Sequence, residues 1–216
     1  MVAIRHYAII RESAAHIAEA ANGAVEALVE ARIEQEPAFT DRMLGRIESA
    51  MDGYVTKGVR WTAKTLTDRG QNSQEREFGA DFAGVLDIDL EDFKVSKGFL
   101  AQAKMIEPRA SVPARDIERM VDQCEVMLKH SPDSFLFLYS MGGISVVPAV
   151  SVVGGHFSNP HELYSRSLSR FYEEHFECFI GDREISSPTP NMLDGLRERL
   201  RVRRLSYLAA QQGAIQ

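Results

Sequence analysis

Three polar side chains lie in two apolar segments, at spacings that suit them to act on a charged ligand. Asp81 precedes one strand-like run, and Gln102 and Lys104 lie two residues apart in a second apolar run. Successive strand side chains point to opposite faces, so Gln102 and Lys104 share a face about 6–7 Å apart, and Ala103 faces away. A lysine in so apolar a run is unfavourable unless an anion or a metal-bound ligand lies beside it. The set therefore suggests metal-assisted hydrolysis of a phosphodiester.

Hydrophobic periodicity predicts the elements that must position these residues. Apolar residues recurring every three or four positions predict helices over residues 12–35, 39–51 and 113–130. Alternating or continuous apolar runs predict strands over residues 59–67, 82–90, 98–106, 134–139 and 144–153. The order is αα-β-β-β-α-β-β, so Asp81 lies at the head of the second strand, and Gln102 and Lys104 lie in the third.

The last third of the chain shows helical signals. Pro160 and Gly181 are typical of a helix start and a helix stop, and an arginine-rich helix is expected over residues 191–211. Arg197, Arg201 and Arg204 would share one face of that second helix. This face is suited to contacts with phosphates, and equally to solvent or a partner protein.

The bulk composition is that of an ordinary folded protein. With 216 residues, 44% of them hydrophobic, we expect one α/β domain over residues 1–216. Its core is expected over about 34–153 and a helical C-terminal extension over about 157–216.

The net charge of −6 disfavours general attraction to nucleic acid but allows a local basic groove. The two cysteines, Cys124 and Cys178, read as buried thiols, and the chain shows no leader and no long apolar run, which predicts a cytoplasmic protein without a membrane partner.

The order of elements and the two motifs resemble the PD-(D/E)XK nuclease superfamily. That family has a helix, a three-stranded meander, a helix and a further strand, with Asp at the second strand and (D/E/Q)-x-Lys on the third. Here the motifs read GAD, ending at Asp81, and QAK, beginning at Gln102 after a twenty-residue gap. The resemblance covers about residues 34–153. It implies a restriction-endonuclease-like αβββαβ core with a mixed sheet.

The resemblance also implies roles for individual residues. In the family the first acid, the second motif position and the carbonyl after it bind Mg²⁺, for which Mn²⁺ can substitute. Carried over, these ligands are Asp81, Gln102 and the main-chain oxygen of Ala103. Lys104 would orient or activate the attacking water and stabilise negative charge in the transition state. Gln123, in the following helix, resembles a further site residue of the RecB-like and Mrr-like branches.

Gln102 departs from the usual pattern, which has Asp or Glu at this position. An amide oxygen is neutral and a weaker ligand than a carboxylate for a hard cation. The missing charge is expected from Glu36, at the start of the second helix, or from Glu77, four residues before Asp81. Glu75 is the third candidate.

The resulting hypothesis is a Mg²⁺-dependent endonuclease that acts on double-stranded DNA, in restriction or anti-phage defence, as a homodimer or with a defence-system partner protein. The alternative, which Gln102 motivates, is a catalytically weakened nuclease-fold module for DNA binding or assembly. RNA hydrolysis is a third possibility. The acidic run over 87–92 is interpreted as a solvated hairpin tip, because Asp87 would lie about 20 Å from Asp81 along an extended strand.

Overall fold

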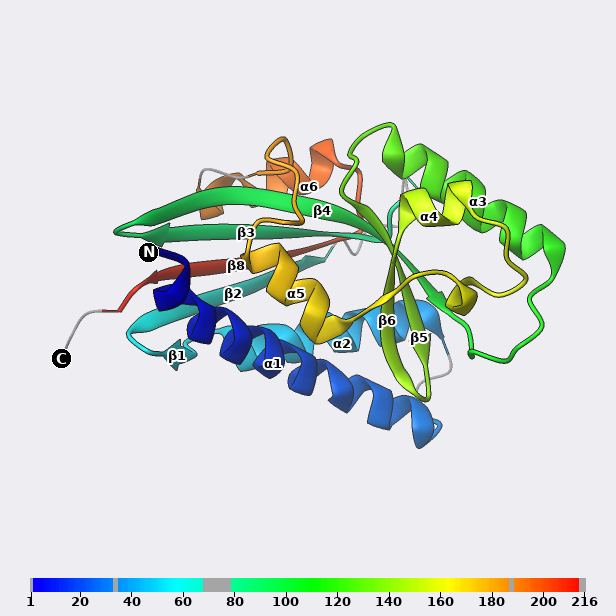
Figure 1. The fold of residues 1–216 in the computed structure, drawn as a ribbon, viewed down its shortest axis with the longest axis horizontal. Coiled ribbons are helices and arrows are strands. Elements are labelled where there is room, and N and C mark those ends of the chain that lie inside the picture. Colours follow the sequence, from blue (N-terminus) through cyan, green and yellow to red (C-terminus); the bar gives the residue numbers. More distant parts are fainter. Residues whose placement is uncertain (1, 33–34, 68–78, 187–188, 214–216) are drawn as a thin grey trace.

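The computed structural model describes residues 2–32, 35–67, 79–186 and 189–213. Its strands are Val55–Thr56 (β1), Val59–Thr67 (β2), Phe82–Leu90 (β3), Phe93–Met105 (β4), Ser134–Ser140 (β5), Gly143–Pro148 (β6), Arg166–Ser167 (β7) and Arg204–Gln212 (β8). Within the described residues they form one mixed sheet in the order β1-β2-β8-β3-β4-β5-β6-β7 (Figure 1). The protein therefore has an α/β fold with an open sheet.

Helices lie on both faces of this sheet (Figure 1). One face carries Val2–Val29 (α1), Glu36–Met51 (α2) and Leu168–Phe176 (α5), and the other carries Ala114–Leu128 (α3), Ala149–Gly154 (α4) and Leu193–Arg199 (α6). Among these described helices, none combines the length and apolar character that crossing a membrane requires.

Two apolar cores lie against the two faces of the sheet, because side chains alternate along each strand. In β3, Phe82 and Leu86 join the core beneath α1, α2 and α5, whereas Ala83 and Val85 join the core beneath α3, α4 and α6. The alternation predicted for this segment is confirmed. Strand β5 is buried along its whole length, which explains why its sequence is a continuous apolar run.

Most predicted elements in the first two thirds of the chain are confirmed. The strands expected over 59–67 and 82–90 match β2 and β3, and the strand expected over 134–139 is β5. The helix expected over 113–130 is α3, with Pro113 as its N-cap residue. Helices α1 and α2 both begin earlier than expected, and β4 begins earlier because the turn after β3 takes only two residues.

The strand expected over 144–153 is wrong beyond Pro148. Strand β6 ends there, and the next six residues form α4. The valines of this segment favour a strand by propensity, but Ala149 and Val152 are buried in the core that α3 also joins. Packing against neighbouring elements therefore overrides the local preference.

The helix expected over 191–211 is confirmed only over Leu193–Arg199 and is wrong beyond it. Helix α6 ends at Arg199, Arg201 adopts a left-handed conformation with φ of 48°, and the chain then enters β8. Strand β8 pairs with β2 on one side and β3 on the other, so it interrupts the expected three-stranded meander. Its first seven residues are buried, which removes the two-residue alternation by which a strand is recognised.

The helix expected between Pro160 and Gly181 is only partly correct. The segment contains a 3₁₀ turn at Pro160–Glu162, then β7, and then α5. Together with β8, this arrangement replaces the helical extension expected over 157–216. Cys178, expected to be buried, is exposed just after α5, whereas Cys124 is buried as expected.

Candidate active site at the open edge of β4

Strand β4 extends beyond the start of β3 and leaves part of one edge open. The last β3 partner of β4 is Ala101, yet β4 continues to Met105, and β5 pairs with this extension on the far side. Backbone groups on the open edge must therefore find partners outside the sheet ladder. Carboxylates from two other elements provide them.

Asp81 and Glu36 bind successive backbone groups along this edge. The Ala103 N–H donates to Asp81 Oδ2 at 2.8 Å, and the Met105 N–H donates to Glu36 Oε2 at 3.1 Å. The Asp81 N–H donates in turn to the Ala101 carbonyl at 2.8 Å, which anchors the start of β3. The two carboxylates are thus aligned along one strand edge, although they come from the residue before β3 and from the first residue of α2.

The side-chain amide of Gln102 contacts two oxygens that the sequence predicts as metal ligands. Its side-chain nitrogen donates to Asp81 Oδ2 and, at 3.1 Å, to the carbonyl oxygen of Ala103. The residue is only 2% exposed. The Asp81 carboxylate, the Ala103 carbonyl and the Gln102 amide therefore form one buried polar cluster, as the spacing of the two motifs predicts.

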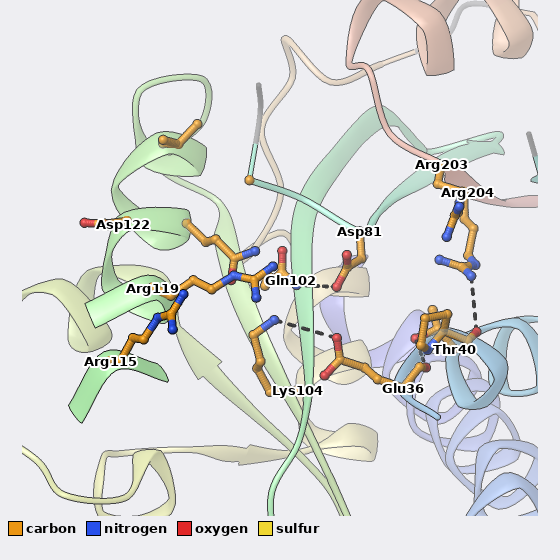
Figure 2. A pocket seen from close by; sticks show the side chains of 14 residues that line it. Glu36, Thr40, Asp81, Gln102, Lys104, Arg115, Arg119, Asp122, Arg203 and Arg204 are labelled. Carbon is orange, nitrogen blue, oxygen red and sulfur yellow. Dashed lines mark hydrogen bonds and ion pairs between the residues drawn. The ribbon is translucent and has the colours of Figure 1, made fainter. Parts of the chain in front are cut away.

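Lys104 lies on the same face of β4 as Gln102, with its side chain 19% exposed. Its ammonium nitrogen is 3.6 Å from Glu36 Oε1 (Figure 2). Burial raises the pKa of the Glu36 carboxyl; the Lys104 charge opposes this shift, and the Asp81 charge adds to it. Glu36 and Asp81 are therefore close enough to repel each other electrostatically.

Arg204 connects the start of β8 to α2 beside this cluster. Its guanidinium donates to both carboxylate oxygens of Asp41 and, at 3.2 Å, to the Pro37 carbonyl. Burial lowers the pKa of Arg204, but the hydrogen bonds and charge of Asp41 outweigh it, and the net shift is upward. With its side chain 3% exposed, Arg204 does not lie on an open helix face as expected but fixes the N-terminal turns of α2, which carry Glu36.

These residues line one cavity of about 680 Å³ between α2, α3 and the sheet (Figure 2). Gln123 of α3 also lines it, and its side-chain oxygen is buried without a hydrogen-bond partner among the described residues. Gly79, with φ of 70°, packs against the same turn of α3, where a Cβ would lie 2.4 Å from the Gln123 carbonyl oxygen. Glycine at the first position of the GAD motif is thus required by this close approach.

The structure brings together Asp81, Gln102, Ala103, Lys104 and Glu36, and Gln123 lines the same cavity. The two other candidate acids, at positions 75 and 77, lie outside the described residues. Sequence reasoning did not identify the cavity residues Arg115 and Arg119. Their spacing of four, followed four residues later by Gln123, would have placed all three on one face of α3.

The acidic hairpin lies apart from this cavity, at the other end of β3. Asp89, Glu91 and Asp92 are exposed, as expected for a hairpin tip. Asp87 is half-buried instead, and it accepts a hydrogen bond from the Tyr207 hydroxyl at 3.3 Å. Burial raises the pKa of Asp87.

No protein-family model, curated protein or solved structure matches this chain. In the described residues, no group of three or more His, Cys, Asp or Glu side chains is placed to hold a metal ion. Beside β4 the cavity instead offers the Asp81 and Glu36 carboxylates together with neutral amide and carbonyl oxygens. Any function must therefore be argued from the chemistry of this site.

Proposed function

We propose that this protein is a Mg²⁺-dependent endonuclease with a restriction-endonuclease-like core, which hydrolyses phosphodiester bonds in double-stranded DNA. One observation carries the proposal. Asp81, Gln102, Lys104 and Glu36, drawn from three elements, meet at the open edge of β4 in one cavity. Acid, amide and lysine at these positions suit hydrolysis at a phosphate.

The donor atoms fit a hard divalent cation. All are oxygens, and Mg²⁺ is commonly bound through one or two carboxylates while it retains several waters. Asp81 raises the pKa of Glu36 through its charge, so the two carboxylates repel, and a cation near both would relieve that repulsion. Asp81, Glu36, the Ala103 carbonyl and the Gln102 amide oxygen would hold the ion. When bound, Mg²⁺ or Mn²⁺ acts as a Lewis acid and lowers the pKa of a bound water.

Lys104 would position the attacking water and stabilise the developing negative charge. Its ammonium group lies on the cavity wall, where it can orient an attacking water and stabilise negative charge that develops on the phosphate. The Glu36 carboxylate, 3.6 Å away, holds the lysine side chain in this position. The partial burial of the site strengthens these electrostatic interactions relative to bulk water.

The test is cleavage of supercoiled plasmid and linear duplex DNA with Mg²⁺, Mn²⁺ or excess chelator. Wild-type protein should cut only with the cation, and Asp81→Ala should abolish cutting because it removes a charged ligand. Circular dichroism should show that Asp81→Ala keeps the wild-type fold. Cation-dependent cutting by the folded variant would contradict the proposal.

A second candidate is a nuclease-fold module with a weakened site that serves DNA binding. Gln102 favours this candidate, because its amide nitrogen donates hydrogen bonds to the Asp81 carboxylate and the Ala103 carbonyl without a cation present. Calorimetric titration separates the two candidates. DNA binding without Mg²⁺ or Mn²⁺ binding at millimolar concentration would favour the module. In a separate cleavage assay, cutting of RNA but not DNA would change the proposed substrate to RNA.

A further inference from the structure

Helix α3 presents two different faces to its surroundings. Met120, Cys124 and Met127 form its buried stripe against the sheet. An adjacent face lines the cavity, and near the helix start this face carries Arg115 and Arg119, both exposed. Figure 2 shows these two side chains extending from α3 on the side of the cavity where Gln102 and Lys104 lie. The arginines therefore flank the candidate active site.

These two arginines differ from the other cations of the cavity whose partners are known. Lys104 faces Glu36, and Arg204 is held by Asp41. No hydrogen bond or ion pair to Arg115 or Arg119 is found within the described part of the chain. Their charges are thus available to an external anion.

The location of the two arginines supports a role in binding an anion. Arg115 lies in the first turn of α3, where the partial positive charge of the helix terminus disfavours a cation. Among the described residues that line the cavity, five side chains are cationic and three are carboxylates, in a chain whose net charge is −6. Local positive charge in an acidic protein is typical of a site that binds an anion.

We infer that Arg115 and Arg119 form a phosphate-binding site that holds the DNA backbone beside the phosphodiester to be cut. The two residues are one helical turn apart, about 6 Å along the axis, so both guanidinium groups can contact one stretch of the same backbone. Guanidinium groups bind phosphate oxygens bidentately, and such contacts position DNA without reading its sequence. This inference rests on the proposed nuclease function.

The test measures binding to a fluorescently labelled 25-base-pair duplex by anisotropy, with chelator present so that no cutting occurs. For Arg115→Gln/Arg119→Gln we expect the slope of log K against log salt to become shallower by about 2, because two phosphate contacts are lost. Affinity in low salt should fall about 10–100-fold. The control Arg60→Gln/Lys129→Gln removes two exposed cations outside the cavity and should keep the wild-type slope.

A second variant separates charge from geometry. Arg115→Lys/Arg119→Lys keeps both charges but loses bidentate contacts, so it should retain the slope and bind more weakly than wild type. A wild-type slope and affinity in the double glutamine variant would overturn the inference, as would a wild-type protein that does not bind DNA. If DNA binding depends on the arginines but no cutting occurs with Mg²⁺ or Mn²⁺, only the nuclease proposal fails.

Discussion

Lys97 and Lys104 both belong to the apolar strand β4, but the structure gives them different surroundings. Lys97 is 2% exposed and donates hydrogen bonds to the carbonyls of His175 and, at 2.6 Å, Ile180. Lys104 lies seven residues later with its side chain 19% exposed, and it faces the Glu36 carboxylate in a cavity. Their positions differ by seven, an odd number, so the two side chains point to opposite faces of the sheet.

This difference shows when a lysine in an apolar strand indicates a functional site. Backbone carbonyls accept the hydrogen bonds of Lys97, and burial lowers its pKa, although the Asp133 charge opposes that shift. Lys104 instead has a carboxylate partner and access to solvent. A buried lysine therefore indicates function only when its partners are acidic and its ammonium group lines a cavity.

The largest effect should come from Lys104. Lys104→Ala should lower DNA cleavage with Mg²⁺ at least about 10³-fold, because it removes the ammonium group that faces the developing charge. The melting temperature should change little, because the side chain is partly exposed and its partner Glu36 keeps the hydrogen bond from the Met105 N–H. Cleavage rates and thermal denaturation of the same preparations check this, and near wild-type cleavage would remove the functional distinction between the two lysines.

Replacement of Lys97 should have the opposite outcome. Lys97→Met keeps the apolar length of the side chain but removes the charged donor from two carbonyls, which should lower the free energy of unfolding by about 2–4 kcal/mol. Urea denaturation measures the loss. Cleavage per folded molecule should remain at the wild-type level; a selective loss of cleavage in a fully folded variant would show that Lys97 acts in the site.

The surroundings of Lys97 should also make stability depend on pH. Burial lowers the pKa of His175 from 6.5 to about 3, with the Lys97 charge lowering it further. Below pH 6.5 the unfolded chain takes up a proton that the folded chain excludes, so stability falls by up to about 1.4 kcal/mol per pH unit. Urea denaturation at pH 7.5, 6.5 and 5.5 tests this; His175→Gln should reduce the slope, and an unchanged slope would exclude His175 as its source.

The smallest effect should concern Glu36, the partner of Lys104. Glu36→Gln should weaken Mn²⁺ binding about 10-fold, since it removes one of two carboxylates. Burial raises the pKa of Glu36 above 4.5, so wild-type affinity should decline with falling pH earlier than for an ordinary glutamate. Calorimetric titrations at pH 7.5 and 5.5 should show a smaller decline in the variant, and equal affinities of the two proteins would remove Glu36 from the site.

Spacing within the two strands was enough to predict that Asp81, Gln102 and Lys104 meet, because a short turn between two strands places the start of one beside the end of the other. It could not decide which glutamate joins them, since Glu36 reaches Met105 from a separate helix. Nor could it distinguish Lys104 from Lys97, because partners on other elements make the difference.

The least predictable part of the fold was β8. Its buried residues lack alternation, and its place between β2 and β3 depends on pairing with strands more than a hundred residues earlier. The pairing of Arg204 with Asp41, across 163 residues, follows from that placement. Contacts of this kind are tertiary and leave no local pattern in the sequence.

Anomalous diffraction from crystals soaked in Mn²⁺ tests the central claim most directly, namely that the open edge of β4 holds a divalent cation. The account predicts a peak within bonding distance of the Asp81 carboxylate and the Ala103 carbonyl oxygen, with Lys104 beside it. A cavity without a peak at saturating Mn²⁺, or a peak only at the acidic hairpin over 87–92, would contradict it.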